Sequence, residues 1–195
     1  MRIALLISIL CAPAWAQEHW DMGLLFGAAG TSSVVVAATP TQAAGSSSGS
    51  VGWNWQWTSA FLLHSNEAGK LNWYAEVPLT FFHAEEVADI ERVGDYFTPG
   101  IRLKIATKTR ISFYGVVGGG WAQYNEKDAL LNGQLTAAAD AATGHPAADV
   151  GGGIDLRLNQ FVSLRLDGRD YITPPGFGGT TGRNHPLFAA GIAFH

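Results

Sequence analysis

The chain has 195 residues, a formal net charge of −4 and a single cysteine. This length is enough for one domain, and the absence of a basic run argues against nucleic acid as a partner. One cysteine excludes a disulfide framework and a cysteine-ligated metal site.

Residues 1–16 have the pattern of a secretory signal peptide. Arg2 precedes an apolar run over 3–10, and a small-residue cleavage site of Ala-Trp-Ala ends at Ala16. The apolar run is too short to cross a bilayer as a helix. We therefore expect cleavage after Ala16, with 17–195 folding as one exported domain.

Eight later segments alternate apolar and polar residues with a period of two, which predicts β-strands. Each is long enough to cross a bilayer as a tilted strand. Pro78 and Pro99 interrupt the third and fourth segments, where they predict a bulged or locally unpaired rim. In chain order, the segments cover 20–28, 52–63, 70–82, 95–106, 110–124, the two halves of a hairpin at 150–169, and 186–195.

The apolar faces of these segments contain no Asp, Glu, Lys or Arg. A charge that faces the middle of a bilayer costs about 2–4 kcal/mol for Arg or Lys, so these faces suit contact with lipid. Some of their tryptophans are expected to form girdles at the two membrane interfaces, although bulk that favours strands is the alternative explanation. The candidate interfacial aromatics are Trp20, Trp53, Trp55, Trp73 and Trp121.

The opposite faces carry charges of both signs. An eight-stranded barrel is narrow enough for side chains to fill it, so we expect these charges to form a polar plug of ion pairs. Asp155 and Arg165 lie symmetrically about the hairpin turn and are expected to face each other. The predicted interior network consists of Glu76, Arg102, Lys104, Arg110, Asp155, Arg157, Arg165, Asp167 and Arg169.

The connections between segments alternate in length. Short ones are predicted near 65–69, 107–109 and 159–160, and long ones at 29–51, 83–94, 125–148 and 172–185. Short turns on one rim and long loops on the other are typical of outer-membrane barrels. A secreted soluble lipocalin-like ligand-binding barrel, with its aliphatic faces turned inward, is the alternative architecture.

Several features together resemble the OmpA- and OmpX-like family of eight-stranded outer-membrane β-barrels, in the barrel domain only. They are the exported N-terminus, the segment 97–103 (FTPGIRL), the glycine run 117–121 (VGGGW) and the charged hairpin at 150–169. The resemblance implies an all-β, antiparallel up-and-down transmembrane barrel with short periplasmic turns and long extracellular loops. It places the protein in the outer membrane of a Gram-negative-type bacterium.

The same resemblance implies partners and shows two departures. The expected partners are the lipid bilayer, lipopolysaccharide and, during biogenesis, the outer-membrane assembly machinery, with the barrel as a monomer. Family members commonly end in an aromatic residue, whereas here Phe194 is penultimate and His195 is last. No periplasmic peptidoglycan-binding domain follows strand eight, so an anchoring role is not implied.

The leading functional prediction is a structural or adhesin-like protein that binds through its long extracellular loops, because loops on a rigid scaffold commonly carry function. Their bland composition does not identify the extracellular ligand. A small porin-like conduit is the first alternative.

Enzymatic modification of lipid A is the second alternative. One class of barrel enzymes has a His-x-Ser-Asn arrangement on a lipid-facing strand, whereas His64, Ser65 and Asn66 are contiguous and fall in a short turn. The other histidines are scattered without the spacing of a zinc motif. We therefore assign no catalytic residue, metal ligand or cofactor.

Overall fold

A computed structural model describes residues 19–30, 34–36, 45–47, 51–66, 70–87, 90–126, 130–131, 134–135, 143–174 and 184–195. It describes side chains at 19–30, 51–66, 70–83, 94–123, 144–174 and 184–195. Within the described residues, no helix is long and apolar enough to span a membrane. The predicted signal peptide, 1–16, lies outside them.

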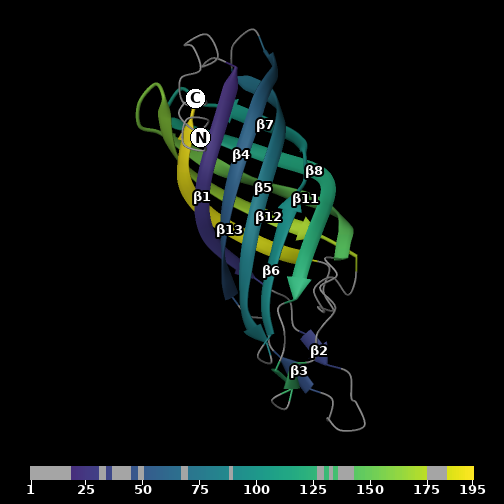
Figure 1. The fold of residues 1–195 in the computed structure, drawn as a ribbon. Coiled ribbons are helices and arrows are strands. Elements are labelled where there is room, and N and C mark those ends of the chain that lie inside the picture. Colours follow the sequence, from purple (N-terminus) through teal and green to yellow (C-terminus); the bar gives the residue numbers. More distant parts are fainter. Residues whose placement is uncertain are drawn as a thin grey trace, which may run out of the picture.

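The strands of the barrel wall are antiparallel and close on themselves (Figure 1). Each pairs with the next along the chain, and the last pairs with the first. The broken strand β6–β7 occupies one position in the wall, which makes the barrel eight-stranded, as predicted. The wall consists of β1 (Trp20–Gly30), β4 (Val51–Ser65), β5 (Leu71–Val87), β6 (Ile90–Phe97), β7 (Gly100–Ala106), β8 (Ile111–Glu126), β11 (Thr143–Arg157), β12 (Val162–Ile172) and β13 (Asn184–Phe194).

Side-chain acceptors close the short turns at one rim. In the β11–β12 turn, Asn159 Oδ1 accepts hydrogen bonds from the backbone N–H groups of Phe161 and Val162, at 2.8 and 2.9 Å. In the β4–β5 turn, Asn66 Oδ1 accepts from the N–H of Lys70 at 2.8 Å. Asn favours tight turns through this kind of bond to the backbone that follows.

The wall has an apolar outside and a charged inside. The outward side chains of Phe188, Val117 and Phe26 are 66%, 61% and 60% exposed, whereas Arg102 and Arg165 on the inside are 0% exposed. A soluble barrel has the reverse polarity, so the soluble alternative is wrong. The polarity is that of a barrel whose outer face contacts lipid.

The strands on the long-loop side are longer than predicted. The expected loop at 83–94 is mostly a hairpin, because β5 continues to Val87 and β6 begins at Ile90. Likewise, β11 begins at Thr143, within the expected loop at 125–148. The sequence at 83–94 and 143–149 shows no regular alternation of apolar and polar residues, which is the pattern on which the prediction relied.

Four short strands also lie in the predicted long loops. They form two separate antiparallel pairs, β2 (Val34–Val36) with β3 (Gly45–Ser47) and β9 (Leu130–Leu131) with β10 (Gln134–Leu135). Segments this short carry too little alternation to be recognised in the sequence.

The two prolines lie midway along the wall, not at its rim as predicted. β5 pairs with β7 up to Glu76 and with β6 from Leu79 onward, and Pro99 separates the two half-strands. Pro78 lies in β5 where this change of partner occurs. Since neither proline has an N–H to donate, the predicted local loss of pairing is present, but in the middle of the barrel.

Candidate functional site in the barrel lumen

Charged side chains fill the lumen at several levels. Among the residues that the structure describes, five buried acids and four buried cations face inward, and they lie on five of the wall strands. Each is at most 6% exposed. Burying so many charges is tolerated only where they pair with one another. The acids are Asp21, Glu76, Asp149, Asp155 and Asp167, and the cations are Arg102, Lys104, Arg165 and Arg169.

Asp21 on β1 joins three cations from other strands of the wall. Its carboxylate accepts from Arg102 Nη1 at 2.8 Å, from Arg165 Nη2 at 2.9 Å and from Lys104 Nζ at 3.2 Å. These cations come from β7 and β12, neither of which is a direct neighbour of β1, so one carboxylate ties three strands together. Bonds between charged partners are stronger than neutral ones.

Asp155 on β11 completes the same cluster. It accepts two bonds from Arg165, from Nε at 2.7 Å and from Nη2 at 2.8 Å, and lies 2.7 Å from Lys104 Nζ. Asp155 and Arg165 are direct cross-strand partners, as their symmetric placement about the turn predicted. Such a two-bond pairing fixes the orientation of the guanidinium plane.

A second cluster continues the network toward the long-loop rim. Arg169 bonds to Asp167 at 2.9 Å, to Asp149 at 3.2 Å and to Glu76 at 2.5 Å. Glu76 also accepts from Arg102 Nε, and Arg102 belongs to the first cluster. The ion pairs therefore form one connected set along the lumen.

Tyr114 on β8 packs between the two clusters. Its hydroxyl donates to Asp167 Oδ2 at 2.6 Å. The guanidinium carbons of Arg102 and Arg165 lie 4.9 and 5.1 Å from its ring centroid, within the range of cation–π contacts. Tyr114 thus stabilises cations of the network through its ring and an acid through its hydroxyl.

On the long-loop side of the ion pairs, aromatic side chains cross the lumen. The Tyr96 ring stacks on Tyr171 at 4.2 Å and on Phe82 at 5.1 Å between centroids. The Tyr171 hydroxyl lies 2.7 Å from Thr80 Oγ1, and His185 Nε2 shares a 2.8 Å bond with Thr173. The lumen is therefore filled by charged groups at one level and by stacked rings at another.

Seven of the nine residues predicted for the interior network lie inside the barrel, but Arg110 and Arg157 do not. Both are exposed, Arg110 in the β7–β8 turn and Arg157 at the end of β11. Alternation alone placed them on the polar face, yet at a turn the chain leaves the wall and polar side chains reach water.

The sequence prediction missed Asp21, Asp149 and Tyr114 as members of the network. Asp21 and Tyr114 lie on the polar faces of the alternating segments 20–28 and 110–124, so the sequence indicates their orientation but not their partners. Asp149 fell between the loop predicted at 125–148 and the hairpin predicted at 150–169, because β11 begins earlier than expected. Partners that are up to 144 positions apart, as for Asp21 and Arg165, become neighbours only through barrel closure.

The predicted interfacial tryptophans lie toward both ends of the wall. Trp20 and Trp73 are near the short-turn rim, and Trp53, Trp55 and Trp121 are nearer the long loops, as their strand positions and registers show. Trp53 and Trp121 are more than half exposed. Two levels of tryptophan are the arrangement that interfacial girdles require.

The residues considered for lipid A chemistry do not form a catalytic set. Ser65 Oγ bonds to Asn72 Oδ1 at 2.6 Å, on the neighbouring strand, and His64 is exposed at the end of β4. Among the described residues, no hydrogen bond joins the His64 side chain to that of Ser65. The arrangement is that of a hairpin end.

A different serine and histidine do approach the geometry of a catalytic triad. Ser163 Oγ lies 2.8 Å from His195 Nε2, and His195 Nδ1 lies 3.1 Å from Asp21. However, Ser163 is 1% exposed and does not border the cavity of about 410 Å³ at the lumen mouth. A nucleophile needs space for a substrate carbonyl, which Ser163 lacks. The contacts of His195 with Ser163 and Asp21 therefore hold the last residue against the barrel wall.

The same aspartate and histidine, with Asp155, bring three possible metal ligands within 4.8 Å of one another. Asp21 and Asp155 already bind Lys104 and Arg165, which would repel a metal cation. This cluster belongs to the ion-pair network.

Comparison with known proteins shows the fold. No family model matches the chain, and no curated protein matches it. Neisserial surface protein A has 12% identity and a TM-score of 0.57, with 90% of this chain and 95% of that chain covered. The attachment invasion locus protein Ail of Yersinia pestis has 12% identity and a TM-score of 0.49, covering 90% and 98%. The N-terminal barrel of Pseudomonas aeruginosa OprF has 10% identity and a TM-score of 0.49, covering 90% and 96%.

Proposed function

We propose that this outer-membrane β-barrel is a closed scaffold that presents binding loops at the cell surface and conducts no solute. The observation that carries the proposal is the connected ion-pair network around Asp21, Arg102 and Arg165. Opening a path through it would require several buried charges to lose their partners at once, and each loss is costly. The stacked rings of Tyr96 and Tyr171 add a second obstruction.

The surface role belongs to the segments predicted as long loops at 29–51, 125–148 and 172–185. A wall held by ion pairs is rigid, and rigid scaffolds with variable loops are a common design for binding. The proposal also includes export through the signal peptide at 1–16, insertion by the outer-membrane assembly machinery, and lipopolysaccharide around the outer half of the wall. Under it, the short-turn rim faces the periplasm.

Two measurements test this function. Folded protein in planar bilayers is expected to give no unitary conductance, and cells that display it are expected to attach to extracellular matrix proteins or host cells. A variant with the three loops replaced by short Gly-Ser turns should remain heat-modifiable in gels but lose attachment. Regular conductance steps, or attachment that survives loop removal, would contradict the proposal.

A narrow conduit is the second candidate, and polar groups on β4 favour it. Both amide atoms of Asn54 and the Nε2 of Gln56 are buried and have no hydrogen-bond partner among the described residues. Buried polar groups commonly bind internal water, and a file of waters beside the ion pairs would pass protons or small ions. The same bilayer recordings decide between the two candidates.

A further inference from the structure

The lipid-facing wall contains an apolar groove of about 560 Å³, a volume typical of small-molecule sites. It crosses β7 and β8 and extends to their neighbours β5 and β11. Trp73, Ile105 and Phe113 stand along it, and the backbone of Gly115 and Gly151 forms part of its floor. Tyr114 is the member of the lumen network that borders this groove.

The groove exists because glycines replace side chains at one level of the wall. Gly115 pairs with Gly152, and Gly152 pairs with Gly168, so three adjacent strands carry glycine in one row. A Cβ added at Gly115 would meet nothing nearer than the Gly151 carbonyl oxygen, at 3.9 Å. The wall is therefore hollowed here between bulkier rows.

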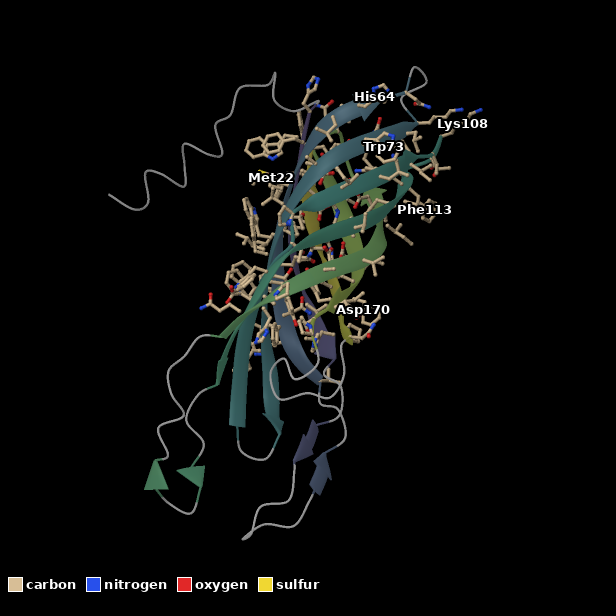
Figure 2. All side chains as sticks on the ribbon, turned by 90° about the vertical axis from the view of Figure 1, so that its right-hand side faces the viewer. Met22, His64, Trp73, Lys108, Phe113 and Asp170 are labelled. Carbon is tan, nitrogen blue, oxygen red and sulfur yellow. The ribbon has the colours of Figure 1, made fainter. Side chains whose placement is uncertain are left out.

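A cationic turn lies at one end of the groove. Ile105 and Phe113 are cross-strand partners just before the β7–β8 turn, and this turn carries Lys108 and Arg110. Figure 2 shows Lys108 at the end of the barrel, on the same flank as Trp73 and Phe113. Both cations are exposed, and neither forms an ion pair with another residue that the structure describes. Cations at this depth attract anionic lipid headgroups.

We propose that this groove and turn form a binding site for one anionic phospholipid. An acyl chain lies in the groove, and the lipid phosphate contacts Lys108 and Arg110. The charge of the turn selects the ligand, because an apolar chain alone would suit any lipid. The assignment to the inner leaflet rests on the proposed function, in which the short-turn rim faces the periplasm.

The test uses the purified full-length barrel, freed of lipid in detergent and examined by native mass spectrometry. Phosphatidylglycerol and phosphatidylcholine with identical acyl chains are added separately. One phosphatidylglycerol per barrel is expected to be retained. Each cation should contribute about fivefold to the preference over phosphatidylcholine, from about 1 kcal/mol per basic residue near an anionic surface.

Two pairs of variants separate the groove from the turn. Gly115→Leu fills the groove and should abolish retention of the lipid. Gly119→Leu is the control, because it adds the same side chain elsewhere on the outer wall, where the nearest atom to a Cβ is also 3.9 Å away. Lys108→Gln and Arg110→Gln should each lower the preference for phosphatidylglycerol about fivefold. Arg157→Gln is the control for these two variants, because it removes a charge at the same rim from a residue that lines the lumen mouth. It should leave the preference for phosphatidylglycerol unchanged.

Equal retention of the two lipids by the native barrel, or undiminished retention by Gly115→Leu, would overturn the lipid site. Preferential retention of lipopolysaccharide would overturn it as well. Heat-modifiable migration and cell fractionation of the same preparations report separately on the barrel in the outer membrane. A lipid site can therefore fail while the proposed function stands.

Discussion

At the scale of single residues, Asp21 has the most connections in the lumen. It contacts Arg102, Lys104, Arg165 and His195, which come from two strands and the chain end. Removing one partner of a buried ion pair is more damaging than removing the pair, because an uncompensated charge remains. The network thus concentrates stability in a few side chains.

We expect Asp21→Asn to lower the free energy of unfolding by about 3–5 kcal/mol, because Arg102 and Arg165 lose a shared carboxylate. Urea unfolding of the barrel in vesicles measures the change. Asp170→Asn is the matched control, since Asp170 accepts from the neutral amide of Asn184, and its effect should stay below about 1 kcal/mol. Equal losses of stability in the two variants would show that the ion pairs of Asp21 contribute no more than the hydrogen bond of Asp170.

The ring and the hydroxyl of Tyr114 are expected to contribute separately. Tyr114→Phe removes the bond to Asp167 and should cost about 1–3 kcal/mol, while keeping the ring beside both arginines. Tyr114→Leu also removes the ring and should cost about 1–2 kcal/mol more. The same unfolding experiment distinguishes them, and identical values for the two variants would remove the cation–π contribution.

At the scale of elements, barrel closure depends on the seam between β1 and β13. The two strands come from opposite ends of the chain and pair from Met22 with Phe194 to Ala29 with Leu187. Gly191 lies in this seam, and a Cβ there would fall 2.0 Å from the Leu24 carbonyl oxygen. The close approach requires glycine at this position.

Gly191→Val is accordingly expected to destabilise the barrel by about 1–3 kcal/mol, since the added side chain pushes the seam strands apart. Ala190→Val adds bulk at the neighbouring position, which is exposed on the outer face, and should change stability by less than about 0.5 kcal/mol. Unfolding midpoints and the heat-modified gel shift provide the measurement. Equal stabilities of the Gly191→Val and Ala190→Val variants would contradict this prediction.

At the scale of the whole molecule, polarity decides the environment. Leu166 is 59% exposed midway along the wall, and Leu158 is 49% exposed in the β11–β12 turn. In water, substitution by arginine at either position would change the stability very little. In a bilayer, the free-energy cost of the arginine depends on its depth. The comparison of these two leucines therefore measures whether the wall contacts lipid.

Leu166→Arg should make folding into vesicles less favourable by about 2–4 kcal/mol, and Leu158→Arg by about 0–1 kcal/mol. The difference arises because only the first charge must enter hydrocarbon. Equilibrium folding into phosphatidylcholine vesicles, followed by tryptophan fluorescence, gives both values. A small and equal effect at the two positions would indicate that Leu166 faces water.

The sequence by itself determined the eight strand positions of the barrel wall, the antiparallel hairpins and which residues of each strand share a face. Alternation is a local property, so Leu164 and Arg165 were assigned to opposite faces without knowledge of any neighbour. The pairing of Asp155 with Arg165 was equally local, because a tight turn sets their register. These features needed no tertiary information.

Only the tertiary structure decided which charges meet across the lumen. Closure brings Asp21 to Arg102 and Arg165, and the early start of β11 places Asp149 in the wall beside Arg169. It also excludes Arg110 and Arg157, which alternation had placed inside. The physical reason is that period-two patterning specifies a face, whereas an ion pair depends on the height and stagger of strands that are distant in the chain.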